Sequence, residues 1–240
     1  MKKYTLTLIL ALVSLGLYAQ TNRNKTIINA ALHGWEYEIK AGVNLGGTAP
    51  LPFPEEIRSI DGYNPTLSIT IEGNMTKWLD TKKKWGIITG LRLENKGMRT
   101  KATVKNYNME IIGYDGNRLK GNWTGGVRTK VQNSYITIPV LAAYKLSPRT
   151  TLKLGPYFSY LMDGDFSGHV YEGYLRETNP TGDKINFTNG AIATYDFSGD
   201  LHKFQWGVQA GVDWKAFKHL KVHADLNWGL NDIFNKDFKT

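Results

Sequence analysis

The chain of 240 residues contains no cysteine. Disulfides, thiol nucleophiles and cysteine-bound metals are therefore excluded. Beyond the first twenty residues it also lacks any run approaching the roughly eighteen apolar residues of a membrane helix. Acidic residues are fewer than basic ones, 21 against 30, and the formal net charge is +9. Because disulfides are excluded, the fold must be held together by packing and backbone pairing alone.

Residues 1–19 have the organisation of a secretory signal peptide. Lys2 and Lys3 form a basic start, an apolar run follows, and Ala19 supplies the small residue before a cleavage site. A membrane-anchoring helix is the alternative, but the apolar run is short for a span. We expect export and cleavage near Ala19. Residues 20–33 are then a periplasmic leader, and residues 34–240 form the folded domain.

Apolar and polar side chains alternate with a period of two residues in most of the remaining chain. In the clearest case Phe204, Trp206, Val208, Ala210, Val212 and Trp214 alternate with glutamine, glycine and aspartate. A helix cannot produce this pattern, and about eleven residues is the length of a tilted transmembrane strand. The sequence predicts seven such strands, at residues 34–45, 66–78, 85–96, 134–146, 151–161, 204–214 and 220–230.

Long and short connections alternate between these strands. Residues 46–64 are expected to be a loop because they are rich in proline, which cannot serve a sheet ladder. Residues 98–132 are long and polar, with weak alternation that allows the hairpin to extend, and 162–203 are expected to be a loop. Aromatic residues gather near the leader and the short turns, as in a membrane-interface belt. The predicted belt consists of Trp35, Trp78, Trp85, Tyr144, Trp214 and Phe217.

The volume of the side chains indicates which face is outside. The apolar face carries roughly five bulky residues on each strand, whereas a small barrel has room for one layer of side chains or one small ligand. The apolar face should therefore meet lipid, and a lipocalin-like soluble barrel is the alternative. The predicted fold is all-β, an antiparallel up-and-down transmembrane β-barrel of the eight-stranded type.

Seven strands is an odd number, whereas bacterial single-chain barrels have an even number. After Leu230 the chain continues with residues 231–240, a mostly polar segment without alternation. An unpaired strand edge in lipid is costly, because each free backbone group costs several kcal/mol. We therefore expect that about one final strand is missing. Closure of the barrel by residues 22–31 is the rival interpretation.

The inward face carries charges of both signs, which form the predicted polar network of the lumen. Its members are Glu38, Lys40, Glu72, Arg92, Glu94, Asp213, Lys221, His223 and Asp225. A network of satisfied ion pairs and a path for solutes or protons are the two interpretations. An acid–base pair of His223 and Asp225 is conceivable, but no serine is placed with this histidine. No catalytic, cofactor or metal residues are therefore predicted.

Much of the basic excess lies in residues 98–130. Nucleic acid is not an expected partner outside the cell. A basic outer loop can instead pair with anionic lipopolysaccharide, and a solvated loop is the plainer alternative.

Several strand segments resemble motifs of the PorT-like outer membrane β-barrel family, whose members are also labelled porin family proteins. The matching segments are Tyr135–Leu141, Thr89–Leu91, Glu94–Gly97, Leu154–Tyr157 and Gly207–Gly211, which together cover nearly the whole mature chain. The resemblance implies a small barrel in the Gram-negative outer membrane. It brings no catalytic residues, and one branch of the family is tied to secretion and surface motility.

We therefore expect an outer-membrane protein without enzymatic activity that acts in envelope structure, in adhesion or in a secretion assembly. Its expected partners are outer-membrane lipid, with lipopolysaccharide as a candidate, and envelope or secretion proteins. A narrow porin-like channel for small solutes is the second hypothesis, and an outer-membrane enzyme is the third.

Overall fold

The computed structural model describes residues 35–47, 55–113 and 116–235. The expected signal peptide and leader therefore lie outside the described residues. The chain divides into a unit of residues 1–36 and a unit of residues 37–240, and the second holds nearly all of the described structure. Its elements are β1 (Trp35–Asn44), β2 (Ile57–Thr66), β3 (Ser68–Trp78), β4 (Trp85–Ile112), β5 (Arg118–Lys145), β6 (Thr150–Glu177), β7 (Lys184–Asp196), the 3₁₀ helix η1 (Ser198–Asp200), β8 (Phe204–Lys215) and β9 (Lys221–Gly229).

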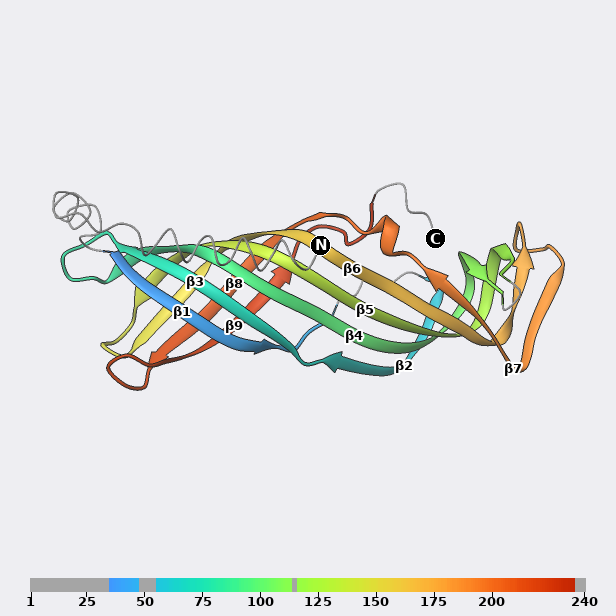
Figure 1. Cartoon of the computed structure of the whole chain (residues 1–240), viewed down its shortest axis with the longest axis horizontal. Coiled ribbons are helices and arrows are strands. Elements are labelled where there is room, and N and C mark those ends of the chain that lie inside the picture. Colours follow the sequence, from blue (N-terminus) through green and yellow to red (C-terminus); the bar gives the residue numbers. More distant parts are fainter. Residues whose placement is uncertain (1–34, 48–54, 114–115, 236–240) are drawn as a thin grey trace, which may run out of the picture. The chain divides into compact units, whose positions relative to one another are not determined.

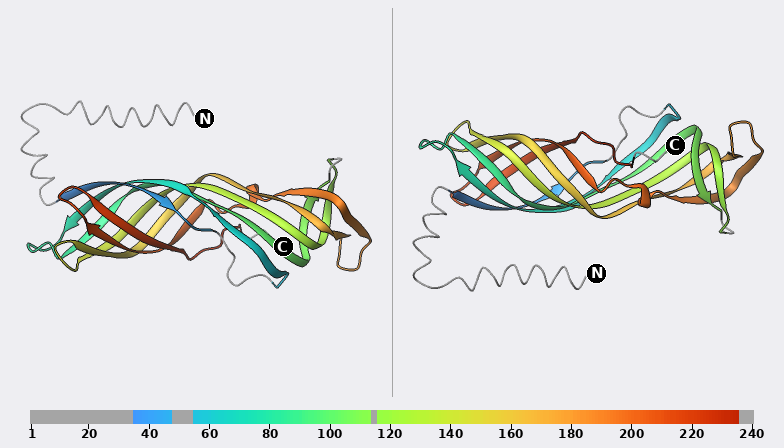
Figure 2. Two further views of the ribbon diagram at one scale, coloured as in Figure 1. Left: turned by 90° about the horizontal axis from the view of Figure 1, so that it is seen from below. Right: turned by 90° about the horizontal axis from the view of Figure 1, so that it is seen from above.

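The main sheet follows the order β1-β3-β4-β5-β6-β8-β9, so that chain neighbours lie beside each other (Figure 1). Each register from β3 to β9 along this order is antiparallel. Figure 2 shows the tilted strands curling around a common axis. These seven strands coincide with the seven that the sequence predicts. The prediction of an antiparallel up-and-down β-barrel is confirmed.

Two predicted loops are wrong, because both contain strands. β2 occupies the second half of the proline-rich segment and pairs with β4. Its Pro65 is tolerated because it lies next to the end of a strand that is paired on β4 alone in the described sheet. In the second predicted loop, β6 continues to Glu177 and β7 pairs along it. The predicted extension of the β4–β5 hairpin is confirmed, since both strands reach 28 residues.

The apolar face changes sides along β4 and β5. Between Trp85 and Glu94 the outward side chains are apolar, as in Leu91 and Leu93, while Arg92 and Glu94 point inward and are buried. From Met98 to Val104 three of the inward side chains, Met98, Ala102 and Val104, are apolar and buried, whereas Arg99 and Lys101 face outward. Apolar and polar side chains therefore alternate in both parts of the strand. The apolar ones point outward in the first part and inward in the second. An outward apolar belt is stable in lipid and an outward charged wall is stable in water, so this reversal marks an edge of the membrane.

β1 and β9 stand at the two ends of the strand order. Side chains bridge them, because Lys221 Nζ donates to Glu38 Oε2 at 2.9 Å. A Cβ atom on Gly42 of β1 would lie 3.1 Å from Nε2 of His223 on β9. The missing final strand stays a prediction, and its rival, closure by residues 22–31, falls outside the described residues.

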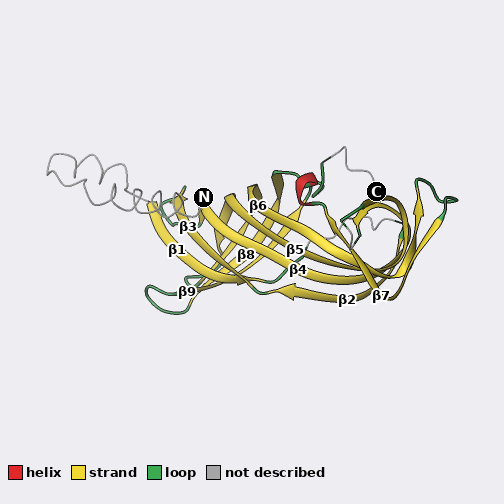
Figure 3. Cartoon of the chain, turned by 45° about the vertical axis from the view of Figure 1, so that its right-hand side comes forward, coloured by secondary structure: helices red, strands yellow, loops and turns green. Residues whose placement is uncertain are grey.

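The three short turns lie together at the left end of Figure 1, and the extended strands reach away from them. In the described residues the only helix is η1, drawn in red in Figure 3. No helix in this part of the chain is long and apolar enough to cross a membrane.

Asp80 organises the turn between β3 and β4. Its Oδ1 accepts hydrogen bonds from the backbone N–H of Trp85 at 2.8 Å and of Lys84 at 2.7 Å. The Trp85 hydrogen bond is the main cause that lowers the pKa of the Asp80 carboxyl, and it outweighs the opposing effect of desolvation. The ionised carboxylate is thus the form that the turn prefers.

We expect Asp80→Ala to lower the thermal midpoint of unfolding modestly at neutral pH. Because the folded-state pKa is depressed, the stabilisation is fully present above the unfolded-state value of about 3.9 and is lost as the pH falls through the folded-state pKa. The difference in thermal midpoint between the unmodified protein and the variant should therefore be constant above about pH 5 and shrink below about pH 4. Each midpoint can be read from heat-modifiable migration on gels after incubation at the chosen pH. A gap that stays unchanged down to pH 2 would rule out a role for the charge.

Candidate functional site

The lumen of the barrel is filled at mid-height by a buried polar network. At its centre Arg92 of β4 donates from Nη1 to Glu72 Oε2 of β3 at 3.2 Å and to Gln209 Oε1 of β8 at 3.1 Å. All three side chains are buried. Since β4 and β8 are separated by β5 and β6 in the sheet order, the contact between Arg92 and Gln209 spans the lumen.

A second group of ion pairs is centred on Asp213 of β8. Lys153 of β6 donates to Asp213 Oδ1 at 2.6 Å and lies 2.8 Å from Asp225 Oδ1 of β9. Lys40 of β1 lies 3.6 Å from Asp213 and 3.8 Å from Glu72. Lys40 therefore joins this group to the one around Arg92.

Glu94 of β4 completes the network toward β5. Its Oε1 accepts a hydrogen bond from Thr137 Oγ1 at 2.8 Å, and Arg92 Nε and Lys96 Nζ lie 3.4 and 3.3 Å from its carboxylate. Thr137 in turn shares a 2.7 Å hydrogen bond with Ser159 of β6. All seven strands of the barrel thus contribute to one network in which cations and anions alternate. Such a network satisfies its own charges and leaves little free bore.

The remaining predicted network residues lie nearer the rim. Glu38 and Lys221 form their pair with more than a third of the lysine side chain exposed. His223 faces the site of Gly42 and is opposite Asp213 in the β8–β9 register. Asp225, the suggested acid–base partner of His223, has its carboxylate against Lys153. The geometry therefore gives Asp225 a role in balancing the charge of Lys153.

Gly211 shows how tightly this level is packed. It stands opposite Asp225 in the β8–β9 register, and the Asp225 carboxylate folds over the position where a Cβ atom would be. A larger residue at position 211 would push Asp225 away from Lys153. Crowding on the polar face explains this glycine.

At the turn end, the lumen is closed by an apolar cluster. Ile88, Leu141 and Ala143 are buried there, and Trp78 packs against them. Trp78 was predicted in the interface belt, but the two-residue period that directs Asn74 and Thr76 inward also directs Trp78 inward. Lys145 Nζ lies 4.5 Å from the centre of its ring.

The other predicted belt aromatics have more outward positions. Trp85 and Tyr144 face each other across β4 and β5 with ring centres 4.5 Å apart. Trp85, Trp214 and Phe217 are exposed, as expected for side chains at a membrane interface. Trp35 is half-buried.

Beyond the membrane edge, β4 to β7 form an extension with its own hydrophobic core. β7 pairs along β6 and also reaches β4, where Ile112 is opposite Thr194. The sheet therefore curls back on itself at this end. Its core includes Ile111, Trp123, Val170, Leu175, Phe187 and Tyr195, all buried.

An apolar pocket of about 380 Å³ is lined in part by residues of this core. Its walls come from β2, β4, β5, β6 and β7 and from the segment after β9, and none of its described lining residues is charged. Phe234 from that segment packs on Phe166 with ring centres 4.8 Å apart. The Tyr195 hydroxyl is satisfied by Thr129 and by the Arg128 carbonyl. Burial raises the pKa of Tyr195 above its usual range, so this hydroxyl stays neutral.

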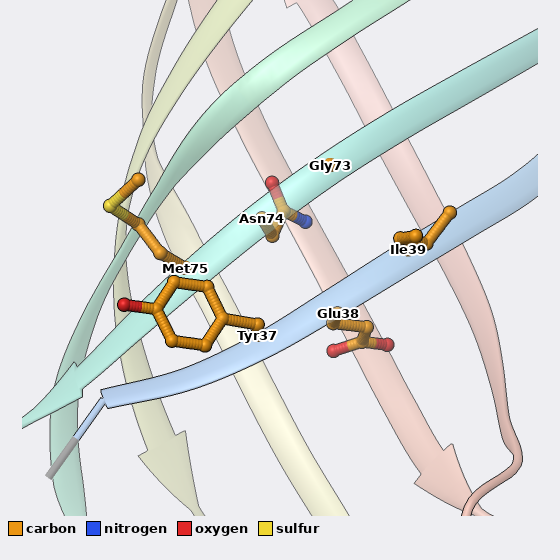
Figure 4. A pocket seen from close by; sticks show the side chains of 6 residues that line it. All are labelled: Tyr37, Glu38, Ile39, Gly73, Asn74 and Met75. Atoms are coloured by element: carbon orange, nitrogen blue, oxygen red, sulfur yellow. The ribbon is translucent and has the colours of Figure 1, made fainter. Parts of the chain in front are cut away.

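A shallower hollow of about 520 Å³ lies between β1 and β3. Figure 4 shows the residues along its edge, including Tyr37, Ile39 and Met75, which flank Gly73. A Cβ atom at Gly73 would meet nothing within 4 Å. Because Gly73 lies on the apolar parity of β3, the hollow opens toward the surrounding lipid, where an acyl chain can fill it.

Sequence reasoning missed several residues of the lumen and all of the apolar pocket. Lys153, Gln209 and Thr137 are buried in the network but were not selected, although Lys153 and Gln209 lie on the polar parity of their strands. The signal for the pocket was also present, in the reversed parity after Lys96. A single alternation pattern extended along the whole hairpin hides this reversal.

A family model described as "Outer membrane protein beta-barrel domain" matches residues 18–235. No curated protein and no solved structure matches the chain significantly.

Proposed function

Since the chain belongs to the outer membrane protein beta-barrel domain family, we propose that this outer-membrane barrel does not conduct solutes and has no enzymatic activity. It acts through its extension in envelope structure, adhesion or a secretion assembly. The PorT-like branch is our finer assignment, supported by the strand motifs. Cleavage near Ala19 is proposed with it, as the route of export.

The observation that carries this proposal is the closed lumen. Arg92, Glu72, Gln209, Asp213 and Lys153 are each at most 5% exposed and meet across the barrel. A channel needs water between opposite walls, and a selective channel needs an excess of one charge. The network offers neither, because its cations and anions are paired.

The extension supports a role in binding. Outer-membrane barrels have their short turns in the periplasm and their longer segments outside the cell. By that rule the apolar pocket lies on the outer side. Its volume falls within the range of about 300–1,000 Å³ that is typical of small-molecule sites. An apolar ligand or an apolar side chain of a partner protein suits its uncharged walls.

We expect the purified full-length protein to give no single-channel current above that of protein-free planar bilayers. The same preparation should show heat-modifiable migration, which establishes that the barrel is folded. As a matched variant, Arg92→Ala with Lys153→Ala removes two long side chains from the lumen and should produce small currents if it folds. Stable, reproducible currents from the unmodified protein would contradict the proposal and favour the channel hypothesis.

A further inference from the structure

The outer wall of the extension carries two directly opposed pairs of cations. In the β4–β5 register Arg99 faces Lys130, and Lys101 faces Arg128. Thr100 and Thr129, which lie between the two pairs, line the inner pocket. The four cations therefore point outward, and all four are exposed.

This arrangement is unfavourable without an external anion. Like charges directly opposite each other destabilise a sheet. Lys130 has one anionic partner, Asp165, at 2.9 Å. Asp61 accepts hydrogen bonds from Ser59 and Thr103. Within the described parts of the chain, Arg99, Lys101 and Arg128 have no ion-pair partner.

The ring side chains beside Arg128 do not reduce its positive charge. Arg128 lies over the ring of Tyr171, 5.0 Å from its centre, which holds the guanidinium in place. His169 stands opposite Arg128 on β6. Desolvation and the charge of Arg128 lower the pKa of His169, which therefore remains neutral at pH 7.

The height of the four cations above the lipid belt indicates which anion they meet. Leu93 is the last apolar outward residue of β4, and Arg99 lies six positions further along the strand. At about 3.4 Å per residue and a tilt of about 40°, Arg99 stands about 15 Å beyond Leu93. A phospholipid headgroup layer is only about 5–7 Å thick. The phosphates of lipopolysaccharide are carried on its sugars and extend further outward.

We propose that Arg99, Lys101, Arg128 and Lys130 form a binding surface for the phosphate groups of lipopolysaccharide in the outer leaflet. The inference rests on the proposed orientation of the barrel, with its extension on the cell surface. It is independent of whether the lumen conducts. Lysine and arginine bind phosphate through charge-assisted hydrogen bonds, and the rigid sheet holds the four side chains in place.

The test measures binding of the purified full-length protein to rough lipopolysaccharide in detergent at low salt. The test variant carries Arg99→Gln, Lys101→Gln, Arg128→Gln and Lys130→Gln. The control variant carries Lys82→Gln, Arg149→Gln, Lys215→Gln and Lys218→Gln, which remove the same charge at the short-turn end, where all four side chains are exposed. Heat-modifiable migration establishes that each variant is folded.

We expect the test variant to bind at least about tenfold more weakly than the unmodified protein, since each cation near an anionic surface contributes substantially. The control variant should bind normally. Dephosphorylated lipopolysaccharide should bind the unmodified protein weakly, and added salt should weaken binding to the intact form. Equal binding by the test variant and the unmodified protein would overturn the proposal. An equal loss of binding in both variants would show that net charge alone drives binding, which would overturn the proposed site. Equally tight binding of phosphatidylglycerol micelles would assign the surface to phospholipid instead.

Discussion

Replacing Asp213 with asparagine should lower the free energy of unfolding by about 3–5 kcal/mol, the usual cost of removing one partner from a buried ion pair. Asp213 is 4% exposed and contacts two buried cations, Lys153 at 2.6 Å and Lys40 at 3.6 Å. Asparagine keeps the shape but not the charge. Lys153 would retain Asp225, whereas Lys40 would retain only the longer 3.8 Å contact with Glu72.

Two further variants separate charge from packing. Glu38→Gln removes an anion from the more exposed pair with Lys221, and should cost at most about 1 kcal/mol. Asp213→Asn combined with Lys40→Met removes one charge of each sign, and should be more stable than Asp213→Asn alone. Urea unfolding of the protein in lipid vesicles, followed by tryptophan fluorescence, measures all three. If the double variant were less stable than Asp213→Asn alone, the loss would have to be assigned to packing.

The seven barrel strands could be predicted because lipid and lumen impose opposite demands on alternate residues. Phe204 to Trp214 shows this clearly, since every second side chain faces outward, and Gln209 and Asp213 between them are buried in the network. The two additional strands escaped prediction for different reasons. β2 follows a run of prolines, and its pairing to β4 depends on residues 97–104, far along the chain. β7 belongs to a glycine- and asparagine-rich segment whose strand character comes from pairing with β6.

The candidate site was predictable only in part, because burial depends on which strands meet across the barrel. Parity alone places Lys40, Glu72, Arg92 and Asp213 inside. It cannot show that Lys153 is the cation shared by Asp213 and Asp225, since that contact joins three strands. Trp78 illustrates the reverse case. Its parity pointed inward, but its position beside a short turn favoured the belt.

The reversal of parity between Lys96 and Met98 connects the fold to the proposed function. It divides β4 and β5 into a part whose outer face suits lipid and a part whose outer face suits water. The same reversal turns the inner face apolar, which creates the pocket, and turns the outer face basic, which creates the proposed lipopolysaccharide surface. One change in sequence pattern thus accounts for both features of the extension.

Val208→Arg should lower the stability of the folded barrel by about 2–4 kcal/mol, the cost of an arginine near the middle of the membrane on the lipid face of a barrel. Val208 lies midway along β8, faces outward and is 39% exposed. Its neighbours across the sheet are Pro156 and Trp228, which offer no anion to the new guanidinium. The fraction that folds into lipid vesicles, read from heat-modifiable migration, measures the effect.

Gln132→Arg is the matched control, because it places the same side chain on the outer face of β5 at the level of the reversal of parity, opposite Gly97. Gln132 is exposed and stands opposite Asp165, so an arginine there should be tolerated with almost no change. Val208→Leu controls for the change of size at the membrane position and should also fold normally. If both arginine variants folded as well as the unmodified protein, the outer belt would have to lie in water, and the lipocalin-like alternative would return. If both arginine variants failed to fold equally, the membrane edge would lie beyond Gln132. The surface of four cations would then lie closer to the lipid than argued above.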